Sequence, residues 1–284
     1  MKYEEDAVLE VGKQGVGINR LDGAVALVTG SGRGLGRTIA EALIAQGANM
    51  ALHDISEQAP AQYGEALSLS AVAEKLSTPG IKTIGVTGDI TKEDQIDAMV
   101  RRVEKELGPI DILVNCAGGD IGAAGQKPNP NGALDVSMED AMAIFQRNFI
   151  GTMLMCRAIC PGMRSMKRGA VVNIGSLNAH QGVSPEVMYA CAKAAIVHYT
   201  RCLALEMRPH GVRVNAVSPG PTKSARFLAT RKLDEEMMSA GDSLVRYADP
   251  QEIANAVVFL AGPASAFISG QVLRVDGAAT LYPG

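Results

Sequence analysis

The sequence alternates short apolar runs with longer segments of helical spacing, and this alternation constrains the fold more than any other feature. Seven apolar runs have the length of strands: residues 24–29, 49–53, 83–86, 111–115, 169–174, 212–217 and 272–275. Most of them are apolar throughout, as in strands that are covered on both faces. Segments with helical periodicity lie between them, at residues 35–46, 92–106, 138–163, 187–207 and 250–260. The pattern predicts an α/β fold with a doubly wound parallel sheet of about seven strands.

The length and composition favour a single domain. A chain of 284 residues with 47% hydrophobic residues can form one large core but is short for two. Residues 1–22 are polar and aperiodic, so we interpret them as an N-terminal arm before a domain at 23–284. Two segments interrupt the alternation: residues 118–135, rich in Gly, Pro and Asn, and residues 221–249, which we interpret as a substrate lid.

The charge and hydropathy patterns exclude several classes of function. The 27 basic and 30 acidic residues give a net charge of −3, which is too weak a field for a protein whose main task is to bind nucleic acid. No apolar stretch approaches the roughly 20 residues of a membrane span. The N-terminus has acidic residues where a signal peptide would carry basic ones. These features predict a soluble, cytoplasmic protein.

The cysteines and histidines do not suggest a metal site. The five cysteines are Cys116, Cys156, Cys160, Cys191 and Cys202. They lack CxxC spacing and stand in apolar segments, so we expect them to be small buried side chains. Cys156 and Cys160 are four residues apart and could share a helix face, but a metal site would need further ligands. The four histidines are scattered, and we predict no metal.

A glycine-rich segment joins the first predicted strand to the first predicted helix. Its glycines fall at 30, 32, 34 and 36, and Gly30, Gly34 and Gly36 fit the spacing GxxxGxG. Glycines in this place let backbone N–H groups approach a pyrophosphate and direct the N-terminus of a helix at its charge. The alternative is a glycine-rich turn without a ligand. The position after the first strand favours a dinucleotide site in a Rossmann-like fold.

An acidic residue after the second predicted strand indicates which dinucleotide is bound. Asp54 stands 24 residues beyond Gly30, where a carboxylate can accept hydrogen bonds from the adenosine ribose hydroxyls and repel a 2′-phosphate. NAD is therefore favoured over NADP. Arg33 and Arg37 leave NADP open, because a guanidinium beside the ribose can bind that phosphate. We interpret the neighbouring His53 as a packing residue of the strand.

Further short segments resemble elements of one protein family in the same order along the chain. They are TGSGRGLG at 29–36, GDI at 88–90, NCAG at 115–118, Asn148, NIGS at 173–176, YACAK at 189–193, NAVSPG at 215–220 and GQVLRVDG at 270–277. Together they resemble the short-chain dehydrogenase/reductase family of the classical type, from about residue 23 to the C-terminus. One departure is Cys116, which stands where the family's NNAG element has its second Asn.

The resemblance implies roles for particular residues. The implied catalytic residues are Ser176, Tyr189, Lys193 and Asn148, with Asn148 holding a water behind Lys193. The implied cofactor-binding residues are Gly30, Arg33, Gly34, Leu35, Gly36, Asp54, Asp89, Ile90, Asn115, Ala117, Gly118, Tyr189, Lys193, Pro219, Gly220 and Thr222. For the substrate we expect Ser176, Asn178, His180 and Tyr189. The family also implies a homo-oligomer, a tetramer formed through residues 138–163, 187–207 and the last strand.

The chemistry of alcohol oxidation calls for the same residue types. Hydride transfer at an alcohol carbon must be matched by proton movement at the oxygen. A phenol has a pKa of about 10, so Tyr189 needs a nearby cation if it is to act as a base near neutral pH. Lys193 lies one helical turn later on the same face, and we expect it to lower the pKa of the phenol. Ser176 would orient the substrate oxygen.

The sequence thus predicts an NAD(H)-dependent oxidoreductase that interconverts a secondary alcohol and a ketone. Asp120, Asn178 and His180 favour a small hydroxylated substrate such as a sugar or polyol, whereas Lys223 and Arg226 leave an anionic substrate open. One alternative is an NADPH-dependent 3-oxoacyl-thioester reductase. Another is a nucleotide-sensing protein that has the dinucleotide fold but no catalytic activity.

Overall fold

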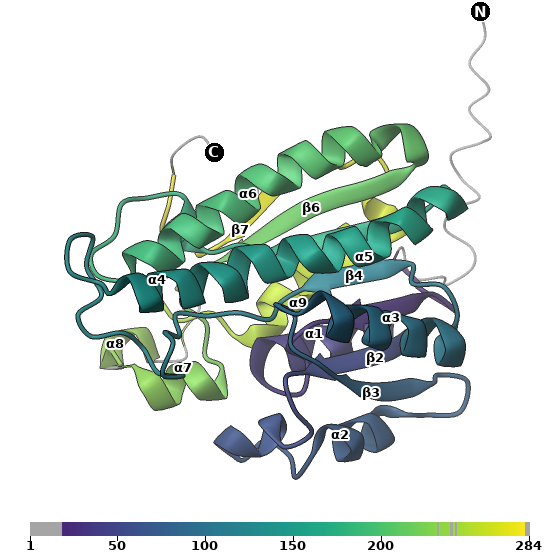
Figure 1. Ribbon diagram of the computed structural model, residues 1–284, viewed down its shortest axis with the longest axis horizontal. Coiled ribbons are helices and arrows are strands. Elements are labelled where there is room, and N and C mark those ends of the chain that lie inside the picture. Colours follow the sequence, from purple (N-terminus) through teal and green to yellow (C-terminus); the bar gives the residue numbers. More distant parts are fainter. Residues whose placement is uncertain (1–18, 232, 239–240, 242, 282–284) are drawn as a thin grey trace, which may run out of the picture.

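The protein is built around one parallel sheet. The computed structural model describes residues 19–281 except 232, 239, 240 and 242. In this part of the chain seven strands form a sheet of order β3-β2-β1-β4-β5-β6-β7 (Figure 1). They are β1 (Val25–Val28), β2 (Asn49–Asp54), β3 (Thr83–Thr87), β4 (Ile112–Asn115), β5 (Gly169–Ile174), β6 (Val212–Pro219) and β7 (Val272–Val275). The predicted doubly wound α/β fold in a single domain is confirmed.

Helices cover both faces of the sheet (Figure 1). One face packs against α3 (Glu93–Leu107), α5 (Gly151–Met166) and α6 (Val187–Met207). The other packs against α1 (Gly34–Ala45), α2 (Leu69–Leu76) and α9 (Pro250–Ala261). Three other α-helices of the described residues are α4 (Met138–Phe145), α7 (Ala225–Thr230) and α8 (Glu235–Met238). The strand order reverses between β1 and β4, and the crevice at this switch point is where such sheets bind ligands.

The structure corrects three predictions about secondary structure and burial. The single helix predicted over 138–163 is two helices joined by a π turn, η3 (Gln146–Ile150). The wider hydrogen bonding of a π turn scarcely changes the spacing of apolar residues, so the sequence did not reveal it. The segment between β2 and β3 contains α2 and a short 3₁₀ helix, η2 (Ala59–Tyr63), which were not predicted. Cys191 and Cys202 are exposed on α6, although all five cysteines were expected to be buried.

The part of the predicted arm that the structure describes packs on the domain. Leu21 is buried, and its N–H donates to the carbonyl oxygen of Gln46 at 2.8 Å. The side chain of Asn19 donates to the carbonyl oxygen of Val258 and accepts from the N–H of Ala264. Residues 1–18 lie outside the described residues. None of the described helices is both long and apolar enough to cross a bilayer.

A buried histidine ties the second strand to the glycine-rich loop. The N–H of Gly30 donates to Nδ1 of His53 at 3.3 Å, so Nε2 carries the proton and donates to the carbonyl oxygen of Gly88 at 2.9 Å. Both bonds require a neutral ring with one proton. Burial accordingly lowers the pKa of His53. The sequence-based interpretation of His53 as a packing residue omitted this link to the loop.

We predict that His53 makes the protein less stable in mild acid. Its pKa is lower in the folded chain than the ordinary 6.5, so the unfolded chain binds more protons and stability falls as the pH drops below about 6.5. Denaturant unfolding between pH 7.5 and 5.5 should show this fall in the wild type and a smaller one in His53→Gln. The substitution itself should cost about 1–2 kcal/mol at pH 7.5. Equal pH slopes in the two proteins would contradict the prediction.

Candidate active site

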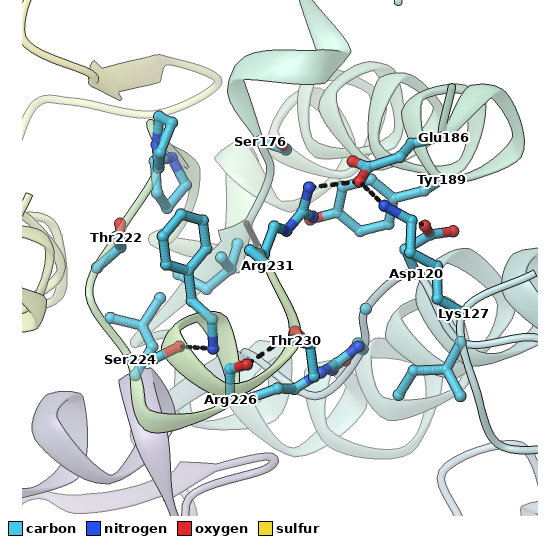
Figure 2. A pocket seen from close by; sticks show the side chains of 18 of the residues that line it. Asp120, Lys127, Ser176, Glu186, Tyr189, Thr222, Ser224, Arg226, Thr230 and Arg231 are labelled. Atoms are coloured by element: carbon cyan, nitrogen blue, oxygen red, sulfur yellow. Dashed lines mark hydrogen bonds and ion pairs between the residues drawn. The ribbon is translucent and has the colours of Figure 1, made fainter. Parts of the chain in front are cut away.

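A cavity of about 710 Å³ lies beyond the carboxyl ends of β4, β5 and β6. Figure 2 shows part of its lining. The walls come from the glycine-rich loop, the segments that follow the three strands, the start of α6 and the α7 region, with Gln62 and Tyr63 of η2 at one end. The volume is in the range that holds a small ligand or a cofactor. Segments far apart in the sequence therefore meet at one site.

The structure brings Ser176, Tyr189 and Lys193 together at this cavity. Ser176 follows the end of β5, and its Oγ accepts a hydrogen bond from the N–H of Asn178 at 3.1 Å. Tyr189 lies in the first turn of α6, and the hydroxyl of Ser176 is close enough to lower the pKa of its phenol. Lys193 follows one turn later, with Nζ 5.6 Å from the centre of the Tyr189 ring. Serine, phenol and ammonium therefore face the same space, as the YxxxK spacing predicts.

The pKa of Tyr189 shifts in the direction opposite to the one expected. Burial raises it, as does the charge of Glu186, and the hydroxyl of Ser176 and the charges of Arg226 and Arg231 offset only part of that rise. The ammonium of Lys193 is itself buried and donates at 2.7 Å to the carbonyl oxygen of Ile174. Burial lowers the pKa of Lys193 to about 8. At neutral pH this structure therefore holds a protonated phenol beside a charged lysine.

Asn148 lies in the π turn and contacts the loop after β4. Its Oδ1 accepts from the N–H of Gly119 at 2.9 Å, and its Nδ2 donates to the carbonyl oxygens of Gly119 and Ile144. A Cβ atom at residue 118 would lie 2.5 Å from Oδ1 of Asn148 and 3.8 Å from Nζ of Lys193, so both side chains lie on the same side of Gly118. Asn148 therefore orders the loop beside the lysine. The water-holding role that the resemblance implies stays a prediction.

The residues expected to bind the adenosine ribose fit that ligand. Asp54 is buried; its Oδ1 accepts from the N–H of Ile55, whereas its Oδ2 has no hydrogen-bond partner. A buried carboxylate oxygen without a donor is what a ribose hydroxyl would satisfy. Gly32 lies against it, since a Cβ atom there would be 2.8 Å from Oδ2 of Asp54. The GxxxGxG pattern treats position 32 as variable, so sequence analysis missed this requirement.

Other residues predicted to bind the cofactor divide into two groups. Those that line the cavity are Arg33, Leu35, Gly118, Pro219, Gly220 and Thr222, besides Tyr189 and Lys193. The others bond within the fold: Asn115 donates to the side chain of Asn173, Ala117 donates to Thr29, and Asp89 accepts from Thr91. Ile90 is buried against α5. These residues hold the ends of the strands that border the site.

Glu65 is a residue at the glycine loop that sequence analysis missed. Its Oε2 accepts at 2.8 Å from the N–H of Gly34, the first residue of α1. A carboxylate is favourable at a helix N-terminus, where the N–H groups have no partner within the helix. The carbonyl oxygen of Glu65 accepts from Arg37. The only signal in the sequence is its place 11 residues after Asp54, which identifies no contact.

A charged network surrounds the opposite end of the cavity. Glu186 is buried, and its Oε1 is 2.6 Å from Nζ of Lys127 and 2.5 Å from a guanidinium nitrogen of Arg231. Its Oε2 accepts from Nδ2 of Asn178 at 3.2 Å. Through Lys127 and Arg231 the network joins the two segments that interrupt the alternation, residues 118–135 and 221–249 (Figure 2). Sequence analysis did not identify Glu186, because nothing local marks it as the partner of two distant cations.

Asp120 also belongs to this end of the cavity, whereas His180 does not. Asp120 is buried, with one carboxylate oxygen bonded to Asn131 at 2.8 Å and the other without a partner. Burial and the nearby charge of Glu186 raise its pKa. The ring of His180 bonds to Ser218 at 2.9 Å, and His180 is not among the residues that line the cavity. Within the described residues, no group of three or more His, Cys, Asp and Glu could hold a metal ion.

The fold and the site define a dinucleotide-dependent oxidoreductase, and comparisons with known proteins identify its family. The family model described as enoyl-(acyl carrier protein) reductase matches residues 30–280. The 3-oxoacyl-(acyl-carrier-protein) reductase FabG of Vibrio cholerae is 33% identical over 90% of this chain and 97% of its own length. Two other similar proteins are the cyclohexanol dehydrogenase of a Rhodococcus species (31% identical over 92% and 97%) and the 7alpha-hydroxysteroid dehydrogenase of Escherichia coli (31% over 91% and 94%).

The chain therefore belongs to the classical short-chain dehydrogenase/reductase family. Its members in this comparison are oxidoreductases that act on CH–OH groups or the matching ketones, and this class of enzyme uses NAD or NADP. The names of these relatives cover acyl, alicyclic and steroid compounds, so the family assignment fixes the reaction class and not the substrate.

We predict that Glu186 and Arg231 stabilise the closed α7 region through a measurable coupling. Glu186→Gln should lower the free energy of unfolding by about 1–2 kcal/mol. The loss stays this small because Lys127 and Arg231, which lose their carboxylate partner, are half-exposed and can be solvated by water. A double-mutant cycle with Arg231→Gln, followed by denaturant unfolding, should give a coupling of about 1 kcal/mol. Strictly additive effects would show that the ion pair contributes nothing.

Proposed function

We propose that this protein is an NAD(H)-dependent oxidoreductase that interconverts a polar secondary alcohol and its ketone. The observation that carries the proposal is the convergence of Ser176, Tyr189 and Lys193 on a cavity that also reaches the glycine-rich loop. A protein that only senses nucleotides has no need for a phenol that lies beside a serine hydroxyl and a buried ammonium. This argues against the non-catalytic alternative.

The proposed proton chemistry follows from the positions of these side chains. The hydride itself is carried by the nicotinamide when it is bound. In the reducing direction Tyr189 donates its proton to the carbonyl oxygen of the substrate, while Ser176 donates a hydrogen bond to the same oxygen. Lys193 stabilises the phenolate that remains. The raised pKa of Tyr189 supports reduction as the direction favoured at neutral pH, with oxidation favoured in alkali.

The surroundings of Asp54 support NAD as the preferred dinucleotide. Two carboxylates, Asp54 and Glu65, lie at the glycine loop where a 2′-phosphate would add negative charge. Arg33 already bonds to Gln62 and lies 3.9 Å from Asp54 and over the ring of Tyr63. Arg37 pairs with Glu41 at 3.0 Å. Both arginines that could have bound the phosphate thus have partners within the chain.

The charged network supports a hydroxylated substrate. Asp120, Glu186 and Asn178 offer acceptors and donors around the cavity, as a sugar or polyol requires. The similarity to a 3-oxoacyl-(acyl-carrier-protein) reductase keeps an NADPH-dependent 3-oxoacyl-thioester reductase as the second candidate. A screen of polyols, sugars and 3-oxoacyl thioesters, followed by the absorbance of the reduced nicotinamide, distinguishes the two.

A tetramer and a cytoplasmic location stay predictions. The exposed side of α6 carries Cys191, His198, Cys202 and Leu205, which form one stripe along the helix. Leu273 of β7 and the fully exposed Phe267 just before it are also apolar. Such a surface supports association through α6 and the last strand. Sedimentation analysis at micromolar concentration tests it.

We predict that Tyr189→Phe abolishes turnover while dinucleotide binding persists. The substitution removes only the phenolic oxygen, so the rate should fall about 10²–10⁴-fold. The dissociation constant for NADH, measured by fluorescence, should change less than threefold. Tyr199→Phe is the matched control: it lies on the same helix, but its ring packs against Phe149 away from the cavity, and its turnover should be retained. Undiminished turnover in Tyr189→Phe would reject the proposed proton donor.

A second prediction concerns the choice of cofactor. The wild type should prefer NADH to NADPH, and Asp54→Asn should narrow the ratio of kcat/KM values by at least tenfold, because it removes the repelling charge and keeps the side-chain size. Asp54→Ala should weaken NADH binding further by removing the acceptor. A wild type that strongly prefers NADPH would show that the ribose argument is wrong and would favour the thioester reductase.

A further inference from the structure

An arginine that faces the cavity from α7 has no acidic partner. Arg226 is half-buried, and its guanidinium donates to the carbonyl oxygen of Gly118 at 3.2 Å. No carboxylate of the described residues lies within 4 Å of it, whereas Lys127, Arg231 and Lys223 all pair with an acid. A charged group taken partly out of water without a counter-ion is unfavourable. The arginine therefore needs an anion from outside the chain.

The backbone beneath Arg226 is shaped to let the guanidinium approach. Gly119 has φ +136°, and a Cβ atom there would overlap the guanidinium nitrogens. The absence of a side chain at Gly119, four residues after the end of β4, thus leaves room for the guanidinium. Asn148 bonds to the same backbone through both the N–H and the carbonyl oxygen of Gly119. Asn148 thus holds in place the backbone on which the guanidinium lies.

This position lies over the crevice between β1 and β4. Gly118 and Gly119 follow β4, and Arg33 belongs to the loop after β1. Arg226 is near enough to Arg33, and to the phenols of Tyr63 and Tyr189 in their ionised forms, for these groups to shift its pKa. The segment that carries Arg226 lies close to the start of α1. A Cβ atom built at Gly34, the first residue of α1, would be 3.7 Å from Cβ of Ser224, two residues before Arg226. Arg226 therefore lies between the adenosine end and the catalytic end of the cavity.

A dinucleotide that crosses this switch point places its pyrophosphate between those ends, above the start of α1. We propose that Arg226 binds the cofactor pyrophosphate, so that α7 closes on the dinucleotide through a charge-assisted bond. The inference rests on the proposed function. A diphosphate supplies the missing counter-ion, and the planar guanidinium can offer it two parallel N–H groups while its stem keeps α7 in place.

The test uses ADP-ribose, which has the pyrophosphate but lacks the nicotinamide and contacts no substrate. Calorimetry should show Arg226→Gln binding ADP-ribose and NADH about tenfold more weakly than the wild type, with Arg226→Lys between the two. The matched control is Arg246→Gln, which removes the same charge from a residue between α8 and α9 that pairs with Glu252 and does not line the cavity, and its affinities should stay within twofold. Affinity for ADP-ribose should also depend less on salt in Arg226→Gln.

Unchanged affinity of Arg226→Gln for ADP-ribose would overturn the inference and leave the proposed function standing. If the same variant then showed a raised KM for an anionic substrate, the arginine would belong to the substrate. A wild type that binds neither ADP-ribose nor NADH would overturn both the inference and the NAD(H) proposal. Thermal melting without ligand, and the conservative Arg226→Lys variant, separate a loss of binding from a loss of folding.

Discussion

The hydrogen bond from the buried ammonium of Lys193 to the carbonyl oxygen of Ile174 holds the site together. A cation in the interior is unfavourable unless it is solvated by the protein, and the end of β5 provides the acceptor. The same bond joins α6, which carries the phenol, to the strand that leads to Ser176. Because Lys193 and Tyr189 share one helical face, fixing the lysine also fixes the phenol. The geometry of the catalytic group thus follows from one buried charge and the strand that accepts it.

The doubly wound sheet was predictable because its strands are continuously apolar and regularly spaced, and the YxxxK spacing placed Tyr189 and Lys193 on one face. The π turn at Asn148 was not predictable, since its altered hydrogen bonding scarcely changes the apolar pattern. Glu65 and Glu186 were missed for a different reason. Each contacts residues about 30 or more positions away, and no local pattern encodes such a pairing.

The pKa of Tyr189 illustrates a limit of reasoning from residue types alone. The sequence showed a cation one turn from a phenol, which predicts a lowered pKa. The fold added two facts that the sequence could not: the phenol is taken out of water, and the ammonium bonds to a carbonyl oxygen. Burial outweighs the attraction of the cations nearby. Both effects follow from the same enclosure that makes the cavity suitable for hydride transfer.

The π turn between α4 and α5 has a consequence for how the chain tolerates change in length. Successive residues of an α-helix are rotated by about 100°, so one extra residue turns everything on its far side by that angle. Here the offset lets α4 bury Ala141 and Ile144 while α5 buries Leu154 and Met155. Removing one residue from Gln146–Ile150 would give a regular α-helix, but it would rotate the buried apolar residues of either α4 or α5 toward the solvent. The π turn at Asn148 thus lets the apolar faces of α4 and α5 both pack against the domain.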